Sequence, residues 1–372
     1  MNAILHDRLM QHRQKGLERS LRLRDGWDLS SNDYLGFASD PLLKQRVITA
    51  VNELSHVGAT GSRLLRGHSE LFTDTEYLLA QFVGCEQALL FPSTYQANLA
   101  VLSALLQTGD TVFSDELNHA SLIDGIRLSR SEKIIYPHRD LQQLRQALSN
   151  VKNKSCLKLI VTESLFSMDG TFADLAALLE IAEEMDAYLL VDEAHSTGLW
   201  GGSYVTSQGL RSNRIMATVH AGGKALGVSG GWVAGSSLLK DYLINFARPF
   251  IYSTAPSPYL AVLLREAVHL HQTVGHDRAT QVLNRAEYFK NTMSEFVNAE
   301  VIGPIIPIII GEVERTVKVA LHLQDRGWDV RAIRPPTVPQ GQARLRLTIK
   351  WGNSDEQLQQ FISHLFEVLA GK

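Results

Sequence analysis

Between residues 88 and 219, the sequence alternates short apolar runs with longer stretches of helical periodicity. Such alternation is typical of strand–helix–strand units, in which parallel strands are joined by crossover helices. The sequence therefore predicts a mostly parallel sheet covered by helices. The predicted strands are residues 88–91, 111–113, 133–136, 157–161, 187–191 and 215–219, and the predicted helices between them are residues 97–106, 121–128, 140–148 and 175–185.

A long helical stretch after Pro258 marks a change in organisation, because the segments that follow it mix isolated strands and helices. Residues 261–273 and 278–297 form this stretch, and we expect it to connect a large domain to a small α+β domain. The small domain is predicted to contain strands 305–310 and 343–349 and helices 317–326 and 355–369. We expect an N-terminal helical segment at 1–30, a large domain at 31–270 and a small C-terminal domain at 271–372.

The composition is that of a globular enzyme. The chain has 372 residues, of which 45% are hydrophobic and 20% charged, which argues against disorder, collagen-like repeats and coiled coils. A net charge of -3 provides no general attraction to nucleic acids or membranes. Cys85 and Cys156 are far apart, which argues against a disulfide framework or a zinc site. With no signal-like or membrane-spanning run, the expected location is the cytoplasm.

The first two dozen residues are basic and show a partial apolar stripe at Leu5, Leu9 and Leu17. One interpretation is a solvated helix packed on the body of the protein. The other is a basic face that binds an acidic carrier protein bearing a thioester. The basic residues are Arg8, Arg13, Lys15, Arg19, Arg22 and Arg24.

Polar residues follow two of the predicted strands at their carboxyl ends, which is where open α/β sheets bind ligands. Strand 187–191 leads into Asp192 and His195, and strand 215–219 precedes Lys224, which lies among glycines. A lysine can hold pyridoxal phosphate (PLP) as a Schiff base, and an acid can keep its pyridine nitrogen protonated. The sequence therefore predicts a PLP site, although a surface lysine and a turn-capping aspartate are the simpler alternatives.

Further segments have the features that a PLP site needs. Residues 93–98 follow a strand and open a helix, so their N–H groups could bind a phosphate or simply begin an ordinary capped helix. His119 could stack on the cofactor ring. Arg344 and Arg346 alternate with apolar residues and therefore face the same way, either inward to bind a carboxylate or on an exposed strand face.

Several motifs occur in the same order over nearly the whole chain: SNDYLG at 31–36, GATGSR at 58–63, LNHASL at 117–122, TESLFSMDG at 162–170, VDEAH at 191–195, GKALG at 223–227 and ARPFIYST at 247–254. With them, the chain resembles the α-oxoamine synthases, which are PLP-dependent enzymes of the aspartate-aminotransferase-like fold. The resemblance implies an α/β large domain with a mostly parallel seven-stranded sheet and a small α+β C-terminal domain. It also implies a homodimer with shared sites.

The resemblance further implies roles for individual residues around the cofactor. Lys224 would form the Schiff base, Asp192 would pair with the pyridine nitrogen and His195 would meet the ring oxygen. These three residues, with His119 stacked on the ring, form the expected catalytic set. The full set of cofactor-binding residues would be Thr94, Tyr95, His119, Glu163, Ser167, Asp192, His195, Lys224 and, toward the partner subunit's phosphate, Thr254.

The sequence RPPT at 334–337 followed by ARLRLT at 343–348 resembles the family members that serve biotin synthesis. These members condense L-alanine with a pimeloyl thioester of CoA or acyl-carrier protein, which gives 8-amino-7-oxononanoate, CO2 and a free thiol. Arg346 and Asn32 would then hold the amino-acid carboxylate, and Arg19 and Thr337 would contact the acyl substrate. Open alternatives are a sister synthase that uses glycine or serine with acyl-CoA, a PLP aminotransferase, and a catalytically silent PLP-fold binding protein.

Two positions depart from the family pattern. Ala221 stands where threonine is usual, three residues before Lys224, and Thr94 stands where glycine is common. The change at Ala221 removes one hydroxyl contact to the phosphate or leaves it to a neighbouring residue. One such hydrogen bond contributes about 1 kcal/mol.

Overall fold

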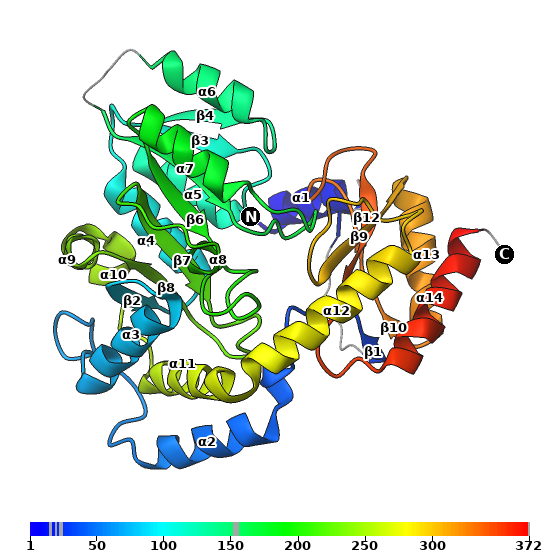
Figure 1. The fold of residues 1–372 in the computed structure, drawn as a ribbon, viewed down its shortest axis with the longest axis horizontal. Coiled ribbons are helices and arrows are strands. Elements are labelled where there is room, and N and C mark those ends of the chain that lie inside the picture. Colours follow the sequence, from blue (N-terminus) through cyan, green and yellow to red (C-terminus); the bar gives the residue numbers. More distant parts are fainter. Residues whose placement is uncertain (15–16, 19–20, 22–24, 152–155, 371–372) are drawn as a thin grey trace.

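The computed structural model describes residues 1–14, 17–18, 21, 25–151 and 156–370. Its largest element is a seven-stranded sheet with the order β2-β8-β7-β6-β5-β3-β4 (Figure 1). Strand β8 runs antiparallel to β2 and β7, and the other neighbouring strands are parallel, which confirms the predicted sheet. The strands are β2 (Gln87–Phe91), β3 (Thr111–Asp115), β4 (Glu132–Tyr136), β5 (Lys158–Glu163), β6 (Tyr188–Asp192), β7 (Ile215–Ala221) and β8 (Gly231–Gly235).

Helices cover both faces of this sheet because its strands are apolar on both sides. On β2, Leu89 packs with helices of one face, whereas Leu90 packs with helices of the other. The first face is covered by α4 (Thr94–Leu105), α5 (Ala120–Ser129), α9 (Ser237–Phe246) and α10 (Arg248–Ile251). The second is covered by α3 (Glu70–Val83), α6 (Leu141–Ser149), α7 (Leu175–Glu184) and α11 (Pro258–Leu270).

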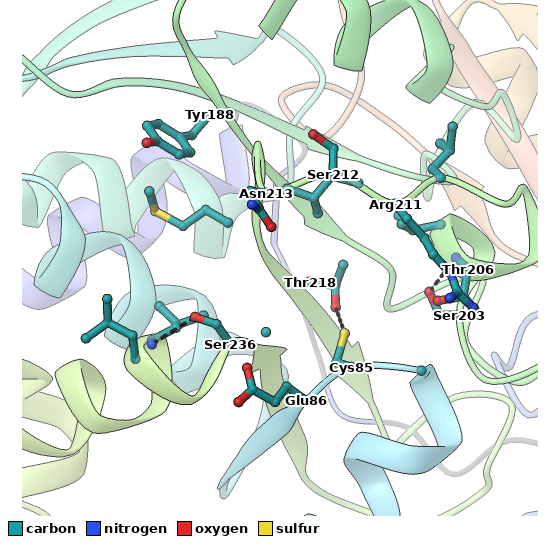
Figure 2. A pocket seen from close by; sticks show the side chains of 18 of the residues that line it. Cys85, Glu86, Tyr188, Ser203, Thr206, Arg211, Ser212, Asn213, Thr218 and Ser236 are labelled. Atoms are coloured by element: carbon teal, nitrogen blue, oxygen red, sulfur yellow. Dashed lines mark hydrogen bonds between the residues drawn. The ribbon is translucent and has the colours of Figure 1, made fainter. Parts of the chain in front are cut away.

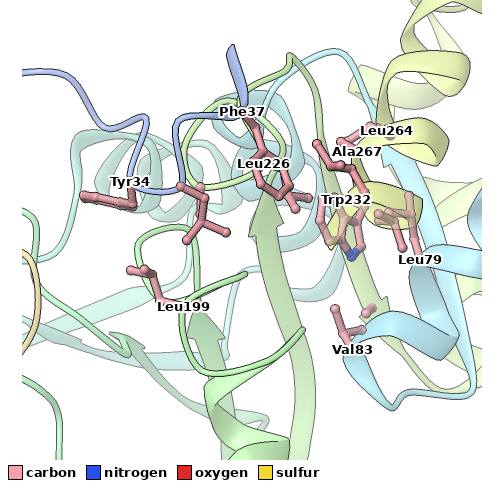
Figure 3. Packing of buried hydrophobic residues seen from close by; sticks show 14 of the residues in the cluster. Tyr34, Phe37, Leu79, Val83, Leu199, Leu226, Trp232, Leu264 and Ala267 are labelled. Carbon is pink, nitrogen blue, oxygen red and sulfur yellow. The ribbon is translucent and has the colours of Figure 1, made fainter. Parts of the chain in front are cut away.

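The core between α3, α11 and the sheet is built around Trp232 of β8, which is fully buried (Figure 3). Leu79 of α3 and Leu264 of α11 belong to the same cluster. Phe37 and Leu226 belong to the same core, and Leu226 lies two residues after Lys224, so this core anchors the segment that carries Lys224. Two further elements lie nearby, η1 (Phe37–Ser39) and α2 (Pro41–Asn52).

Side-chain caps determine where several helices begin. Ser93 accepts a hydrogen bond from the N–H of Gln96 at 3.2 Å, so α4 begins three residues earlier than predicted. Asp140 accepts from the N–H of Gln143 at 2.9 Å, which confirms it as the N-cap of α6. The short helix α8 (Tyr204–Ser207) was not predicted.

Helix α12 (His276–Thr292) carries the chain from the large sheet to the C-terminal elements (Figure 1). It continues α11 through a π-helical segment, His271–Gly275, so the predicted long helical stretch is present but ends five residues early. The C-terminal elements are β9 (Ile305–Gly311), α13 (Val313–Asp325), β10 (Trp328–Asp329), β11 (Ala332–Ile333), β12 (Ala343–Thr348) and α14 (Asp355–Leu369).

A separate core holds these C-terminal elements together. Strands β11, β12 and β9 form a three-stranded antiparallel sheet, and α13 and α14 pack on it. Strand β1 (Trp27–Asp28) pairs with β10, and Leu29 joins this C-terminal core although it lies far earlier in the sequence. The division into domains at residues 30 and 270 stays a prediction.

The N-terminal helix α1 (Asn2–Gln14) covers only the first part of the predicted helical segment 1–30, since Trp27–Asp28 forms strand β1, and none of the side chains of α1 is buried. The structure therefore gives no support to the expectation that it packs on the body of the protein. Among the described residues, no helix combines the length and the apolar character needed to cross a membrane.

Candidate active site

The carboxyl ends of three adjacent parallel strands bring the predicted acids and the lysine together. Glu163 at the end of β5 is in register with Asp192 at the end of β6, and Asp192 is in register with Val219 of β7. Lys224 follows β7 after two glycines. A Cβ on Gly222 would lie 2.5 Å from the carbonyl oxygen of Ser229, so this close turn requires glycine.

Asp192 is buried and accepts two hydrogen bonds, which fix the direction of its carboxylate. Its Oδ2 accepts from Nδ2 of Asn98 at 2.6 Å and its Oδ1 from the N–H of Ala194 at 2.8 Å. Asn98 also donates to the hydroxyl of Ser121 at 2.9 Å, and Nδ1 of His119 lies 2.8 Å from that hydroxyl. His119 and Asp192 are therefore joined through two side chains whose roles the sequence did not reveal.

Asn98 could have been noticed only as a polar residue in an otherwise apolar part of helix α4. It lies within the 93–98 segment that we considered for phosphate binding, but its contact with Asp192 spans 94 residues of sequence. Such a contact depends on how α4 lies against β6, which local patterns do not encode.

Burial shifts the protonation of the groups between the strand ends. It lowers the pKa of Lys224 to about 8, although the carboxyl groups of Asp192 and Glu163 oppose this change. Burial, together with the negative charge of Asp192, raises the pKa of Glu163 well above its usual range. Burial also lowers the pKa values of His119 and His195. The site therefore favours neutral histidines and a lysine that loses its proton more readily than a surface lysine.

His195 is buried next to Tyr34. After Asn98 and Ser121, Tyr34 is the third residue of the site whose role the sequence analysis missed. The Tyr34 hydroxyl lies 2.7 Å from Nδ1 of His195, and burial raises the pKa of Tyr34 to about 12. A phenol that stays protonated can donate to Nδ1 and leave Nε2 of His195 as the N–H group. Tyr34 belongs to the SNDYLG motif, which was the available signal.

The start of α4 contacts the end of β7, as expected for a phosphate site. The hydroxyl of Thr94 donates to the carbonyl oxygen of His220 at 3.3 Å. Ala221 pairs in register with Gly231, and a Cβ on Gly231 would lie 2.5 Å from the backbone nitrogen of Thr94. The Thr94 hydroxyl therefore lies beside Ala221, the position that lacks the usual threonine. Tyr95 is exposed, and its hydroxyl donates to Asp124.

The other side of the site comes from the small sheet. Arg346 of β12 donates from Nη2 to Oδ1 of Asn32 at 2.8 Å and from Nε to the backbone carbonyl of Ser167 at 2.6 Å. Its Nη1 also donates to Thr348 at 3.0 Å. Arg344 and Arg346 are 1% and 6% exposed, so the alternative of an exposed strand face is wrong. Ser167 takes part through its backbone.

Three predicted residues are not drawn into this arrangement. Thr254 and Thr337 are exposed. Arg19 lies outside the described residues. The proposed contacts of all three with substrate or partner subunit stay predictions.

A cavity of about 760 Å³ lies at the opposite edge of the large sheet (Figure 2). It is lined by Tyr188 and Ile215, which begin β6 and β7, whereas Asp192 and Lys224 lie at or beyond the other ends of these strands. Cys85 and Thr218 also line it, with Sγ and Oγ1 4.0 Å apart. This cavity is separate from the candidate site.

The residues at the strand ends fit PLP. Within the described part of the chain, Oε1 of Glu163 and Oδ1 of Asn98 are buried and make no hydrogen bond. A polar molecule bound between them and Asp192 would supply partners for these oxygens, and a protonated ring nitrogen suits the Asp192 carboxylate. The glycine at 231 leaves the first N–H groups of α4 accessible to a phosphate.

Comparison with known proteins agrees with this interpretation. The sequence profile of the Aminotransferase class I and II family matches residues 24–365. The 8-amino-7-oxononanoate synthases of Lysinibacillus sphaericus and Alkalilimnicola ehrlichii are each 38% identical to this chain, and each alignment covers 99% of the chain and 98% of the relative.

Solved structures share the fold. A serine palmitoyltransferase from S. paucimobilis with a bound PLP–myriocin aldimine has a TM-score of 0.89 at 23% identity, covering 99% of this chain and 97% of that one. The 8-amino-7-oxononanoate synthase from Francisella tularensis has a TM-score of 0.79 at 27% identity, covering 93% and 98%.

Fold and site thus define a PLP-dependent enzyme of aminotransferase class I and II architecture. Within that architecture, the chain belongs to the α-oxoamine synthase family. The predicted family, fold and cofactor are confirmed. The roles of the individual site residues stay predictions.

Proposed function

We propose that the protein catalyses the 8-amino-7-oxononanoate synthase reaction, in which L-alanine and a pimeloyl thioester are joined with loss of CO2 and a thiol. One observation carries the proposal: Lys224 and Asp192 stand at the ends of neighbouring strands, and Arg346 reaches the same site from the small sheet. This arrangement can hold a cofactor and an amino-acid carboxylate at once. The names of the relatives that match nearly the whole chain support this activity.

PLP, when bound, draws electrons away from the Cα of the amino acid. The protein would keep the ring nitrogen protonated, and Asp192 would do so. The hydrogen bonds from Asn98 and Ala194, which hold its carboxylate in one direction, support this role. His119 is held by Ser121 and would lie against the ring face. His195, oriented by Tyr34, would donate its Nε2 proton to the ring oxygen.

Lys224 would move the proton on Cα. Its pKa is lowered to about 8, so the neutral amine is more abundant near neutral pH than for a surface lysine. In its neutral form, the amine can accept the Cα proton. A base placed in this way typically contributes about 10² to 10⁴ in rate.

Arg346 would bind the alanine carboxylate. A guanidinium has five N–H donors, and the described contacts use one on each of its three nitrogens. The Tyr34 hydroxyl is a further hydrogen-bond partner of this guanidinium. A bound carboxylate would share or displace that contact while it takes the remaining N–H groups of Nη1 and Nη2, with which arginine can bind a carboxylate through two hydrogen bonds. Asn32 would hold the Nη2 group in place for this contact.

In the proposed reaction, Cα of alanine loses a proton and forms a bond to the thioester carbonyl carbon. The C–S bond of the thioester then breaks, and the leaving thiol takes up a proton. The carboxylate then leaves as CO2, and a proton returns to Cα from a neighbouring group such as His195 or His119. The acyl donor would contact Arg19 and Thr337.

We infer that the enzyme works as a homodimer in the cytoplasm, with pimeloyl-CoA or a pimeloyl-acyl-carrier protein as acyl donor. The exposure of Thr254 supports the dimer, because its expected ligand is the phosphate in the partner subunit's site. The exposed basic helix α1 suits an acidic carrier protein, and a solvated surface helix is the alternative.

The test measures thiol release by the PLP-loaded protein with L-alanine and pimeloyl-CoA, next to Lys224→Ala. We expect release that requires L-alanine and is lost in the variant. A panel of glycine, L-serine and other acyl thioesters distinguishes the sister synthases. Amino transfer to a keto acid without thiol release would refute the synthase proposal, and so would an unchanged absorbance spectrum with every amino acid.

A further inference from the structure

A hairpin at residues 164–173 connects the two halves of the site. Its base is attached to the strand end that carries Asp192, since the N–H of Ser164 donates to the Asp192 carbonyl at 2.9 Å. The base is closed by the N–H of Ala173, which donates to the Ser164 carbonyl at 3.1 Å, and by an antiparallel bridge between Leu165 and Phe172. The base therefore moves with β6 of the large sheet.

The tip of this hairpin is held by two arginines of β12. Arg346 donates to the carbonyl of Ser167 at 2.6 Å, and Arg344 donates from Nη1 to the carbonyl of Met168 at 3.0 Å. The same Nη1 forms an ion pair with Oδ1 of Asp169 at 2.6 Å. Alternate residues of a strand point to the same face, which is why both arginines reach one hairpin.

The geometry of the tip leaves little room for adjustment. Gly170 has a φ of +65°, and a Cβ there would lie 2.3 Å from the carbonyl oxygen of Ile305 at the start of β9. Its carbonyl accepts from the N–H of Ile302 at 3.1 Å. The tip is thus pressed against the same small sheet whose strand β12 holds it.

Arg344 is more constrained than Arg346. It is 1% exposed, and Nε and Nη2 donate to the carbonyl and Oε1 of Gln342 at 3.1 and 2.9 Å. Four of its five N–H donors are used within the protein, two of them on Nη1, whereas the hydrogen bonds of Arg346 to Ser167, Thr348 and Asn32 use three of its five. Arg344 is therefore not placed to bind substrate, and the mechanism above does not use it.

We propose that Arg344 is a positioning residue for amino-acid recognition. Its ion pair with Asp169 fixes β12 on the hairpin. In this way it determines the position of Arg346 relative to Asp192 and Lys224. This inference rests on the proposed function, in which Arg346 binds the carboxylate of an α-amino acid. The ion pair joins the small sheet, which holds the carboxylate, to the large sheet, which holds the reacting amine. Its loss should displace the carboxylate and leave binding of the amine itself intact.

The experiment compares Asp169→Asn and Arg344→Lys with the wild-type holoenzyme. Asp169 is the milder site, because its side chain is 23% exposed and the asparagine can be hydrated. Arg344→Lys keeps the charge but removes the fork that binds Gln342 and Asp169 together. Arg326→Gln, which removes an exposed ion pair with Glu367 on the small-sheet side, is the matched control.

A comparison of two ligands distinguishes a positioning role of Arg344 from a general loss of structure in the variants. Absorbance titration of the bound cofactor would give dissociation constants for L-alanine and for ethylamine, which has the amine but no carboxylate. A hydrogen bond between charged groups is worth about 10- to 100-fold in affinity, so we expect L-alanine to bind at least about 10-fold more weakly in both variants. Ethylamine binding, the KM for the acyl thioester, PLP affinity and the melting temperature of the apoprotein should match those of Arg326→Gln.

Three outcomes would overturn the inference: unchanged L-alanine binding in Asp169→Asn, an equal loss for L-alanine and ethylamine, or a fall in kcat with L-alanine binding unchanged. If the wild type binds another α-amino acid in place of L-alanine, the proposed function is wrong and the comparison is made with that amino acid. If the wild type binds no α-amino acid more tightly than ethylamine, both the proposed function and this inference are wrong.

Discussion

Replacing Glu193 with glutamine should increase the stability of the protein relative to the wild type as the pH rises, because among the described residues this buried carboxyl group has no charged partner. Glu193 directly follows Asp192 and is fully buried. Its Oε1 accepts from the N–H of Val205 at 2.7 Å, but its Oε2 makes no hydrogen bond among the described residues. The mechanism does not use this side chain.

The neighbouring histidine does not neutralise it. Nδ1 of His220 lies 3.6 Å from Oε2 of Glu193, but burial lowers the pKa of His220 to about 3. The ring is therefore uncharged above that pH. It also has partners of its own, since Nδ1 lies 2.9 Å from the hydroxyl of Thr197 and Nε2 lies 2.8 Å from that of Thr218.

The size of the effect follows from the pKa of Glu193, which burial raises from 4.5 to about 7. Between these two values the folded state binds more protons than the unfolded state, so the wild type loses stability as the pH rises through this window. A displacement of this size corresponds to about 3 kcal/mol. Glutamine does not titrate, and any constant cost of placing its amide near His220 cancels when the same variant is compared across pH.

The measurement is the melting temperature of wild type and Glu193→Gln in parallel from pH 5 to pH 8. We expect the difference between them to shift steadily in favour of the variant and to level off above pH 7. Glu180→Gln, on the exposed face of α7, is the control and should show a flat difference. A flat difference for Glu193→Gln as well would show that its carboxyl group is solvated or paired in the native protein.

Two further changes test the cofactor site. Burial lowers the pKa of Lys224 to about 8, so the rate of covalent PLP binding to the apoprotein should increase as the pH rises through 8. Rapid-mixing absorbance measures this rate. A midpoint of the rate near pH 10 would contradict the burial of Lys224. Thr94→Gly removes the hydroxyl beside Ala221, and if this hydroxyl turns from the His220 carbonyl to the bound phosphate, the variant should bind PLP more weakly by about 1 kcal/mol in a fluorescence titration. Adding Ala221→Thr should restore the affinity, and an unchanged affinity in Thr94→Gly would exclude the hydroxyl as a phosphate ligand.

Most of the large sheet could be predicted because its parallel strands are buried on both faces and so appear as short apolar runs. Strand β8 was missed, since Gly231–Gly235 has glycines at both ends and only three residues between them. What makes it a strand is its antiparallel pairing with β2 and β7, two segments from different parts of the chain. Local propensity carries no record of such pairing.

In the site, too, contacts between residues far apart in the sequence could not be predicted from local patterns. Asp192 and Lys224 were predictable because parallel strands bring their carboxyl ends to one edge, whatever the details of packing. The alternation in β12 predicted that Arg344 and Arg346 face one way, and burial shows which way. The contact of Tyr34 with His195 joins residues 161 positions apart, so it follows from tertiary packing and not from either local pattern.

The charges that remain in the site match those of its expected ligands. Burial favours the neutral forms of Glu163, His119 and His195. This leaves the carboxylate of Asp192 at one side, the guanidinium of Arg346 at the other, and the amine of Lys224, which is charged below about pH 8 until it bonds to the cofactor. A buried charge is tolerated where a ligand can pair with it, and the protonated ring nitrogen and the amino-acid carboxylate have the required signs. A ligand without a carboxylate would leave Arg346 unpaired, so the charge at this end of the site selects for α-amino acids independently of the shape of the pocket.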